Sequence, residues 1–409
     1  MAYETLKQIH ENNQSVWLER YNDRFNAPFT EHFNIFIKQY DFPKSYQAFL
    51  CITPEILYLI NAIHSLNNEL NLDLRSLPSV AVRQLTQAYM IEEIHASNEI
   101  EGVRSSRKEI RNALELTTLF NKDKVVRFSS IVSKYNKLIN RTEINFETCQ
   151  DIRNFYDEFI LSEVATENIT NKPDGKIFRA DKVHVTNNAT QQTIHLGTFP
   201  ESKLIDEMEQ ALKILHDEKY PLVIRIAIFH YLFGYIHPFY DGNGRTIRFI
   251  TSYFLAMDFT PLVAFNLSLL IKRHRDFYYE MFTETTSHLN CGDLGFFVTE
   301  FLHIIKKSIE DVVNYVKDQK NNLDDWKDKI KSLDIKDKTT LDLYCILLQA
   351  TIFSAVGISM QEITFVLKKS INTIKTRLNA MPVEHLLIDT SEKTHRYKLN
   401  LNHIATNKQ

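Results

Sequence analysis

Residues 221–248 read PLVIRIAIFHYLFGYIHPFYDGNGRTIR, and this stretch decides the fold of the chain around it. Its first part is apolar on nearly every side, which predicts a buried central helix, and Pro221 suits a first helical turn. Pro238 ends that helix. A second helix is expected to begin near Asn243 and to continue through RTIRFITSYFLAM. The stretch therefore predicts a helix–loop–helix in which residues 242–244 form the start of the second helix.

Apolar residues recur at helical spacing elsewhere in the chain, as at Leu204, Met208, Leu212 and Leu215. Only nine glycines and ten prolines interrupt 409 residues. This pattern predicts a mainly α-helical protein. Residues 178–197 differ, because FRADKVHVTNNATQQTIHLG alternates around a polar centre and predicts a β-hairpin with its turn near Asn187–Asn188.

The chain is expected to have four parts. Residues 1–110 predict an N-terminal helical region, and 111–315 a helical core. Residues 316–338 are dense in charges of both signs and predict a solvated connecting helix. Residues 339–409 predict a small winged helix-turn-helix domain, because three helical segments precede two short strand-like segments, HLLID and YKLNL.

The composition is that of an ordinary soluble protein, with 44% hydrophobic and 24% charged residues. A net charge of −3 provides no global attraction for nucleic acid or an anionic membrane. The four cysteines are far apart in the sequence and predict reduced thiols. The N-terminus has no apolar signal core and no apolar run approaches the length of a membrane span, so a cytoplasmic location is expected.

The loop at 237–248 combines residue types that suit phosphate chemistry. Backbone N–H groups at a helix start bind phosphate oxygens, and Gly242 and Gly244 leave room for that approach. Asn243 either tolerates an unusual backbone angle or holds the loop by side-chain hydrogen bonds. Arg245 and Arg248 are three residues apart, so both are expected on one side of the helix, against anionic oxygens.

Two further side chains of this loop complete a reaction centre. Asp241 offers a hard oxygen ligand, and Mg²⁺ is usually held by one or two carboxylates together with substrate phosphates. His237 is the residue type whose ordinary pKa suits proton abstraction near neutral pH. The loop therefore predicts attack of a hydroxyl on a nucleotide phosphate.

The string HPFYDGNGRTIR also resembles the Fic motif, HPFx(D/E)GNGRxxR, at every fixed position. Fic proteins are helical enzymes that mostly transfer AMP from ATP to a Ser, Thr or Tyr hydroxyl of a protein. The resemblance implies ATP as substrate with Mg²⁺, His237 as the base and Asp241 as the metal ligand. It also implies that the hairpin at 178–197 is a flap on which the target protein docks by strand addition. The ATP-binding residues would be Gly242, Asn243, Gly244, Arg245, Thr246, Ile247 and Arg248.

Residues 97–102, SNEIEG, resemble the inhibitory pattern of the same family, (S/T)xxxE(G/N), with Ser97, Glu101 and Gly102 at the fixed positions. A carboxylate paired with Arg248 would occupy the place of the γ-phosphate. ATP would then bind with its α-phosphate wrongly oriented for attack. The resemblance therefore implies an autoinhibited enzyme.

A third segment, IKRHRDFYYEMF, resembles the family segment whose tyrosines flank the adenine. Tyr278 and Tyr279 are the candidates, although the Asn that some relatives carry further on is Thr286 here. Two adjacent aromatic residues on a helix are by default one core and one surface residue. His230 lies on the helical face of His237, and we interpret it as structural.

Several alternatives stay open. The same site would run the reverse hydrolysis and remove AMP from a protein, and UTP, GTP or another donor would use the same phosphate contacts. A DNA-binding regulator with a nucleotide-sensing core is the alternative outside enzymology. Residues 359–401 hold seven Lys or Arg against four Asp or Glu, a small excess that makes DNA a possible but not favoured partner of 359–400. The target protein, self-modification and a homodimer are not decided by the sequence.

Overall fold

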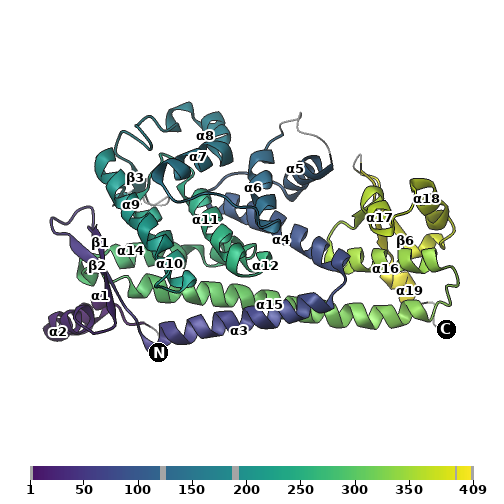
Figure 1. The fold of residues 1–409 in the computed structure, drawn as a ribbon, viewed down its shortest axis with the longest axis horizontal. Coiled ribbons are helices and arrows are strands. Elements are labelled where there is room, and N and C mark those ends of the chain that lie inside the picture. The colour runs from purple at the N-terminus through teal and green to yellow at the C-terminus, as the bar shows by residue number, and fades with distance from the viewer. Residues whose placement is uncertain (1–2, 120–125, 187–192, 392–393, 407–409) are drawn as a thin grey trace. The chain divides into compact units, whose positions relative to one another are not determined.

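The computed structural model describes residues 3–119, 126–186, 193–391 and 394–406, and it is mainly helical with three small sheets (Figure 1). The helices are α1 (Leu6–Asn12), α2 (Gln14–Phe25), α3 (Pro54–Ser76), α4 (Ser79–Ile100), α5 (Arg107–Leu119), α6 (Ser129–Ile139), α7 (Cys149–Phe159), α8 (Leu161–Glu167), α9 (Glu201–His216), α10 (Leu222–Ile236), α11 (Asn243–Asp258), α12 (Pro261–Ala264), α13 (Leu267–Arg273), α14 (Arg275–Thr286), α15 (Gly295–Lys331), α16 (Lys338–Phe353), α17 (Met360–Leu367), α18 (Ile371–Asn379) and α19 (Leu401–Thr406). Short 3₁₀ turns are η1 (Ile169–Asn171), η2 (His288–Asn290) and η3 (Val383–His385). The strands are β1 (Thr30–Ile37), β2 (Tyr46–Cys51), β3 (His184–Thr186), β4 (Thr193–Leu196), β5 (Ile358–Ser359), β6 (Leu386–Asp389) and β7 (Arg396–Leu399).

The chain forms two compact units. The first contains residues 1–67 and 91–309, and the second contains residues 68–90 and 310–409. The boundary between the units lies within α3, α4 and α15, so the domain boundaries expected from the sequence stay a prediction. The connecting helix expected at 316–338 is not a separate element, because its residues to Lys331 continue α15.

Helix α10 is the centre of the first unit and packs against α9 and α11 (Figure 1). It is buried on nearly every side, as its apolar sequence predicts. Pro221 stands at the N-cap, one residue before the helix, rather than in its first turn. Helix α11 begins at Asn243 as predicted. The helix–loop–helix of residues 221–248 is therefore confirmed.

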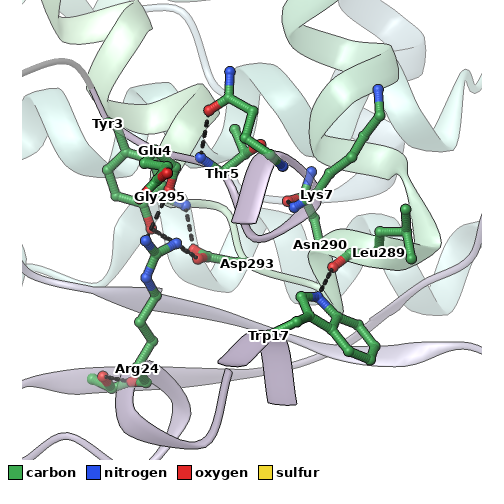
Figure 2. A network of polar contacts seen from close by, with 12 residues as sticks. Tyr3, Glu4, Thr5, Lys7, Trp17, Arg24, Leu289, Asn290, Asp293 and Gly295 are labelled. Carbon is green, nitrogen blue, oxygen red and sulfur yellow. Dashed lines mark hydrogen bonds and ion pairs between the residues drawn. The ribbon is translucent and has the colours of Figure 1, made fainter. Parts of the chain in front are cut away.

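The N-terminal region contains an antiparallel pair, β1 and β2, that the sequence analysis did not predict. Alternate residues of β1 are buried, which is the pattern of a strand with one face on a core. Figure 2 shows how the segment before this pair is tied to the residues before α15. Tyr3 and Arg24 both donate to the carboxylate of Asp293, at 2.8 and 3.1 Å, and Trp17 Nε1 donates to the carbonyl of Leu289.

The predicted hairpin is present as the antiparallel pair β3 and β4. Its expected turn, Asn187–Asn188, lies outside the described residues. In the second unit, α16, α17, α18, β6 and β7 follow one another in the order that the sequence predicts, and β5 adds a third strand to give the order β5–β7–β6. Among the described residues no helix is long and apolar enough to cross a membrane. The four cysteines are free thiols, three of them buried.

Candidate active site

The loop between α10 and α11 is held by hydrogen bonds from its own residues and from α7. Asn243 accepts a hydrogen bond from the backbone N–H of Phe239 at 2.9 Å and donates one to the carbonyl of the same residue at 2.8 Å. The hydroxyl of Tyr156 donates to the carbonyl of Asp241. Gly242 has a φ of +78°, a left-handed conformation that glycine adopts without a steric penalty. Of the two roles that the sequence left open for Asn243, the structure shows the one made by side-chain hydrogen bonds.

His237 ends α10 in a left-handed conformation, with φ 54° and ψ 64°. Its Nδ1 lies 3.4 Å from the carbonyl of Gly234, an acceptor, so this nitrogen carries the proton and Nε2 is left with a lone pair. Burial lowers the pKa of His237 to about 4, with smaller contributions from His195 and Arg179. The imidazole is therefore neutral at pH 7, which is the form that accepts a proton.

Arg248 is fully buried and binds the predicted inhibitory segment with all three guanidinium nitrogens. Nη1 donates to Glu101 Oε1 at 2.8 Å, Nε to Ser97 Oγ at 3.1 Å and Nη2 to the carbonyl of Ser97 at 2.8 Å. Burial opposes the charge of Arg248, but Glu101 keeps its pKa above the ordinary value. Gly102 follows with a φ of +74° at the end of α4. The structure thus brings the two sequence motifs into direct contact.

The absence of a side chain at Gly244 allows Glu101 to approach the start of α11 closely. A Cβ atom at position 244 would overlap the Oε1 atom of Glu101 and would lie 2.9 Å from Arg248 Nη1. The carboxylate therefore lies directly against backbone that has no side chain to shield it. Since helix starts bind anions, Glu101 occupies the position that the sequence assigns to phosphate.

Arg245 faces a different acid, Glu163 of α8, which the sequence analysis did not single out. The two side chains are 2% and 10% exposed and their charged atoms are 3.6 Å apart. Within the described residues, the guanidinium nitrogens of Arg245 have no hydrogen-bond partner. Burial raises the pKa of Glu163 to about 7, against the opposing effect of Arg245. Buried donors without hydrogen-bond partners are costly, so the guanidinium of Arg245 keeps unused donors that a further acceptor would satisfy.

The remaining sequence candidates lie in the core or beside it. Thr246 and Ile247 are buried, so contact with a nucleotide would fall to their backbone. Tyr278 is buried and its hydroxyl lies 2.7 Å from Nε2 of His230, whose Nδ1 lies 2.7 Å from the Thr251 hydroxyl. His230 is therefore structural, as interpreted.

Tyr279 has an exposed side chain, so this tyrosine pair consists of one core and one surface residue. Thr286, at the position where some relatives carry Asn, bonds the Tyr231 hydroxyl at 3.0 Å. Recognition of adenine by Tyr278 and Tyr279 stays a prediction.

The residues present fit a magnesium–phosphate complex better than a metal held by protein alone. Among the described residues there is no group of three His, Cys, Asp or Glu that would hold a metal ion. Asp241 supplies one carboxylate, whose Oδ1 accepts from the N–H of Gly242. One carboxylate is a ligand set that Mg²⁺ uses when substrate phosphates complete its shell, and the helix start and the buried Arg245 would bind those phosphates.

Comparisons with known proteins agree with this geometry. Residues 147–255 match the model of the Fic/DOC family, so the chain contains a Fic domain. Among curated proteins, the chain is 24% identical over 275 residues to "Protein adenylyltransferase fic-1" of Caenorhabditis elegans, covering 65% of this chain and 49% of the relative. It is 27% identical over 212 residues to "Protein adenylyltransferase Fic" of Aedes aegypti, covering 49% of this chain and 38% of the relative. The chain thus spans half or less of the length of these curated relatives.

A solved structure shares the fold. A Fic family protein from Desulfovibrio desulfuricans G20 aligns with a TM-score of 0.51 and 19% identity, over 85% of this chain and 96% of that one. The mainly helical fold predicted from the sequence is therefore that of a Fic protein.

Proposed function

We propose that this chain is a protein adenylyltransferase held inactive by Glu101. The observation that carries the proposal is the position of the Glu101 carboxylate, 2.8 Å from Arg248 and against Gly244 at the start of α11. An ATP phosphate and this carboxylate would compete for the same donors. ATP bound in the productive orientation therefore requires Glu101 to leave, which accounts for inhibition in physical terms.

The proposed reaction uses the residues in fixed roles. The N–H groups at the start of α11 and the guanidiniums of Arg245 and Arg248 would bind the phosphates of ATP. Asp241 would hold Mg²⁺, which neutralises phosphate charge. Nε2 of His237 would accept the proton of the target hydroxyl as its oxygen attacks the α-phosphorus. The bond to the bridging oxygen then breaks and pyrophosphate leaves.

The described strands of the hairpin, β3 and β4, suit a role in holding the target. They form a two-stranded sheet, and an extended target segment would add to a free edge of it. The target itself, including the chain's own hydroxyls in self-modification, belongs to this proposal and is tested with it.

The test compares wild type with Glu101→Gly, using ATP labelled at the α-phosphate and Mg²⁺. The Glu101→Gly protein should label itself or a protein of a host lysate about tenfold faster or more, a change that needs only about 1.4 kcal/mol. The control is Glu101→Gly/His237→Ala, which should transfer no label. Equal labelling by wild type and Glu101→Gly would contradict inhibition by Glu101, and absence of label from both would contradict AMP transfer.

Removal of AMP from a modified protein is the second candidate, because Glu101 lies close enough to His237 to influence its pKa. A carboxylate there would orient a water molecule towards the phosphorus. Pre-labelled target distinguishes the two directions. Wild type should release labelled AMP and Glu101→Gly should not, if removal is the activity.

A further inference from the structure

The C-terminal end of α10 leaves backbone carbonyls that no helical N–H reaches. The carbonyl of Tyr235 is met by Nε2 of His195 at 2.6 Å. The carbonyl of Ile236 accepts from the backbone N–H of Thr198 at 3.0 Å. Both donors belong to the second half of the hairpin segment, β4 and the residues after it. The end of the helix that carries His237 is therefore capped by the hairpin.

Arg179, at the start of the same segment, completes this cap. Its side chain is 1% exposed, and Nε donates to the carbonyl of His237 at 2.9 Å. Nη2 donates to the carbonyl of Thr198 at 2.8 Å, and Nη1 donates to that of Asp181. No carboxylate of the described residues pairs with this guanidinium, so backbone carbonyls alone balance a fully buried charge. Such an arrangement is costly unless the carbonyls are held in place for it, and the negative end of the α10 dipole favours a cation there.

Two features of the backbone show that the Arg179 side chain and His237 are closely packed. His237 has a positive φ, which costs free energy in a residue other than glycine and persists only where surrounding contacts hold it. Gly197 makes room beside it, because a Cβ atom there would lie 2.5 Å from Arg179 Nη2 and 3.0 Å from the Cβ of His237. The guanidinium is thus packed between the hairpin and the backbone of the proposed base.

We propose that Arg179 is a positioning residue for His237, binding the carbonyl of His237 so that its strained backbone and imidazole keep one orientation. This inference rests on the proposed function, in which His237 accepts the proton of the target hydroxyl. Arg179 acts through His237 and does not touch the reacting atoms. Its positive charge also favours the neutral imidazole, together with His195, while Glu101 has the opposite effect.

The test introduces Arg179→Met and Arg179→Lys into the Glu101→Gly protein. Arg179→Met should lower kcat about 10²-fold, the loss that follows a small misplacement of a catalytic group, with KM for ATP changed less than about twofold. Arg179→Lys keeps the charge and one donor and should restore part of kcat. The matched control is Arg225→Met, since Arg225 Nη1 caps the Leu215 carbonyl at the end of α9 at 2.9 Å, away from His237. Arg225→Met should leave kcat unchanged.

A second readout does not depend on turnover. The titration of His237 is followed by NMR in protein with ¹³C-labelled histidine, with its signal assigned by its loss in His237→Ala. Removal of the Arg179 charge should move this titration to higher pH, whereas Arg225→Met should not. If the Glu101→Gly protein transfers no AMP, the proposed function is wrong, but the NMR titration of His237 still tests the role of Arg179. Equal kcat losses in the two Met variants, or an unchanged His237 titration in Arg179→Met, would overturn the positioning role.

Discussion

Arg245 and Arg248 have different partners, although their spacing predicts that both lie on one side of α11. Arg248 donates a hydrogen bond from each of its three nitrogens to Ser97 or Glu101, whereas the guanidinium of Arg245 has only a long ion pair with Glu163. The sequence predicts Arg248 with Glu101, because both belong to recognisable motifs. It does not predict Glu163, since nothing in LSEVATE marks this acid, and its contact with Arg245 depends on how α8 packs beside α11.

The pKa of His237 predicts an activity profile without an acid limb near pH 6.5. Because burial lowers this pKa to about 4, the imidazole stays neutral, and the Glu101→Gly rate should be nearly constant from about pH 8 to about pH 5.5 and fall only towards pH 4. An acid limb centred near 6.5 would contradict the lowered pKa of His237.

The same pKa has a consequence for stability. The unfolded chain binds a proton at His237 below the ordinary pKa of 6.5, while the folded protein does so only below about 4. The contribution of His237 to stability is therefore complete above 6.5 and is lost as the pH falls from there to about 4. Denaturation of wild type and His237→Gln across this range should show a smaller loss on acidification for the variant.

A methyl group at position 244 tests whether Glu101 lies against α11. In wild type, Gly244→Ala should cost about 1–3 kcal/mol of stability because the new Cβ overlaps the Glu101 carboxylate. In the Glu101→Gly background the cost should fall well below this, since only the Arg248 Nη1 atom stays close. A double-mutant cycle by chemical denaturation measures the difference. Equal costs in both backgrounds would place Glu101 elsewhere.

At the scale of elements, helix α4, which leads into Glu101, is held in place through one of its faces. Glu93 and Ser97 are four residues apart and lie on one side of the helix, and Glu101 follows one residue after its end. Glu93 is fully buried and accepts hydrogen bonds from the backbone N–H and the hydroxyl of Ser268, at the start of α13. Its carboxylate thus ties α4 to α13, eight residues before Glu101.

Glu93→Ala should therefore release the inhibitory helix. We expect a loss of about 1–3 kcal/mol of stability, because the Ser268 donors lose their partner, together with increased AMP transfer in an otherwise wild-type protein. Glu92→Ala is the matched control, since Glu92 pairs with Arg107 on the surface and such pairs contribute about 1 kcal/mol or less. A protein destabilised by Glu93→Ala yet no more active would show that this anchor does not control inhibition.

The sequence predicts the central elements of the fold well and the peripheral ones poorly. Helices α9, α10 and α11 and the β3–β4 pair follow from apolar periodicity and turn residues, which are local signals. Strands β1 and β2 were missed although β1 alternates, because β1 packs on residues that are distant in the sequence, as Phe33 does on the ring of Tyr220. The cap on α10 was missed for the same reason, since Arg179 and His237 meet only in the folded chain.

At the scale of the whole molecule, the second unit offers an apolar rather than a strongly basic surface. Phe365 and Val383 are 75% and 86% exposed, and Leu387 and Ile388 of the edge strand β6 are about half exposed. Lys368, one of the basic residues of this unit, lies at the C-terminal end of α17 in a left-handed backbone conformation. Exposed apolar side chains of this size are typical of protein contacts, so we favour a protein partner for this unit.

A binding measurement with random duplex DNA tests this preference. At physiological salt the full chain should bind no more tightly than about 10⁻⁵ M, within the range of non-specific association. Submicromolar binding that weakens steeply with salt and is lost in Lys368→Glu/Lys369→Glu would favour a DNA-binding regulator instead.

The overlap of Glu101 with the space above Gly244 couples the binding of ATP to the binding of any partner that displaces Glu101. If ATP in its productive pose and Glu101 in its inhibitory pose exclude each other, any partner that binds only when Glu101 is withdrawn must strengthen ATP binding. By thermodynamic reciprocity, ATP strengthens the binding of that partner by the same factor. A single glutamate would thus let the enzyme respond to the product of two concentrations, the nucleotide and its activator, rather than to either one alone.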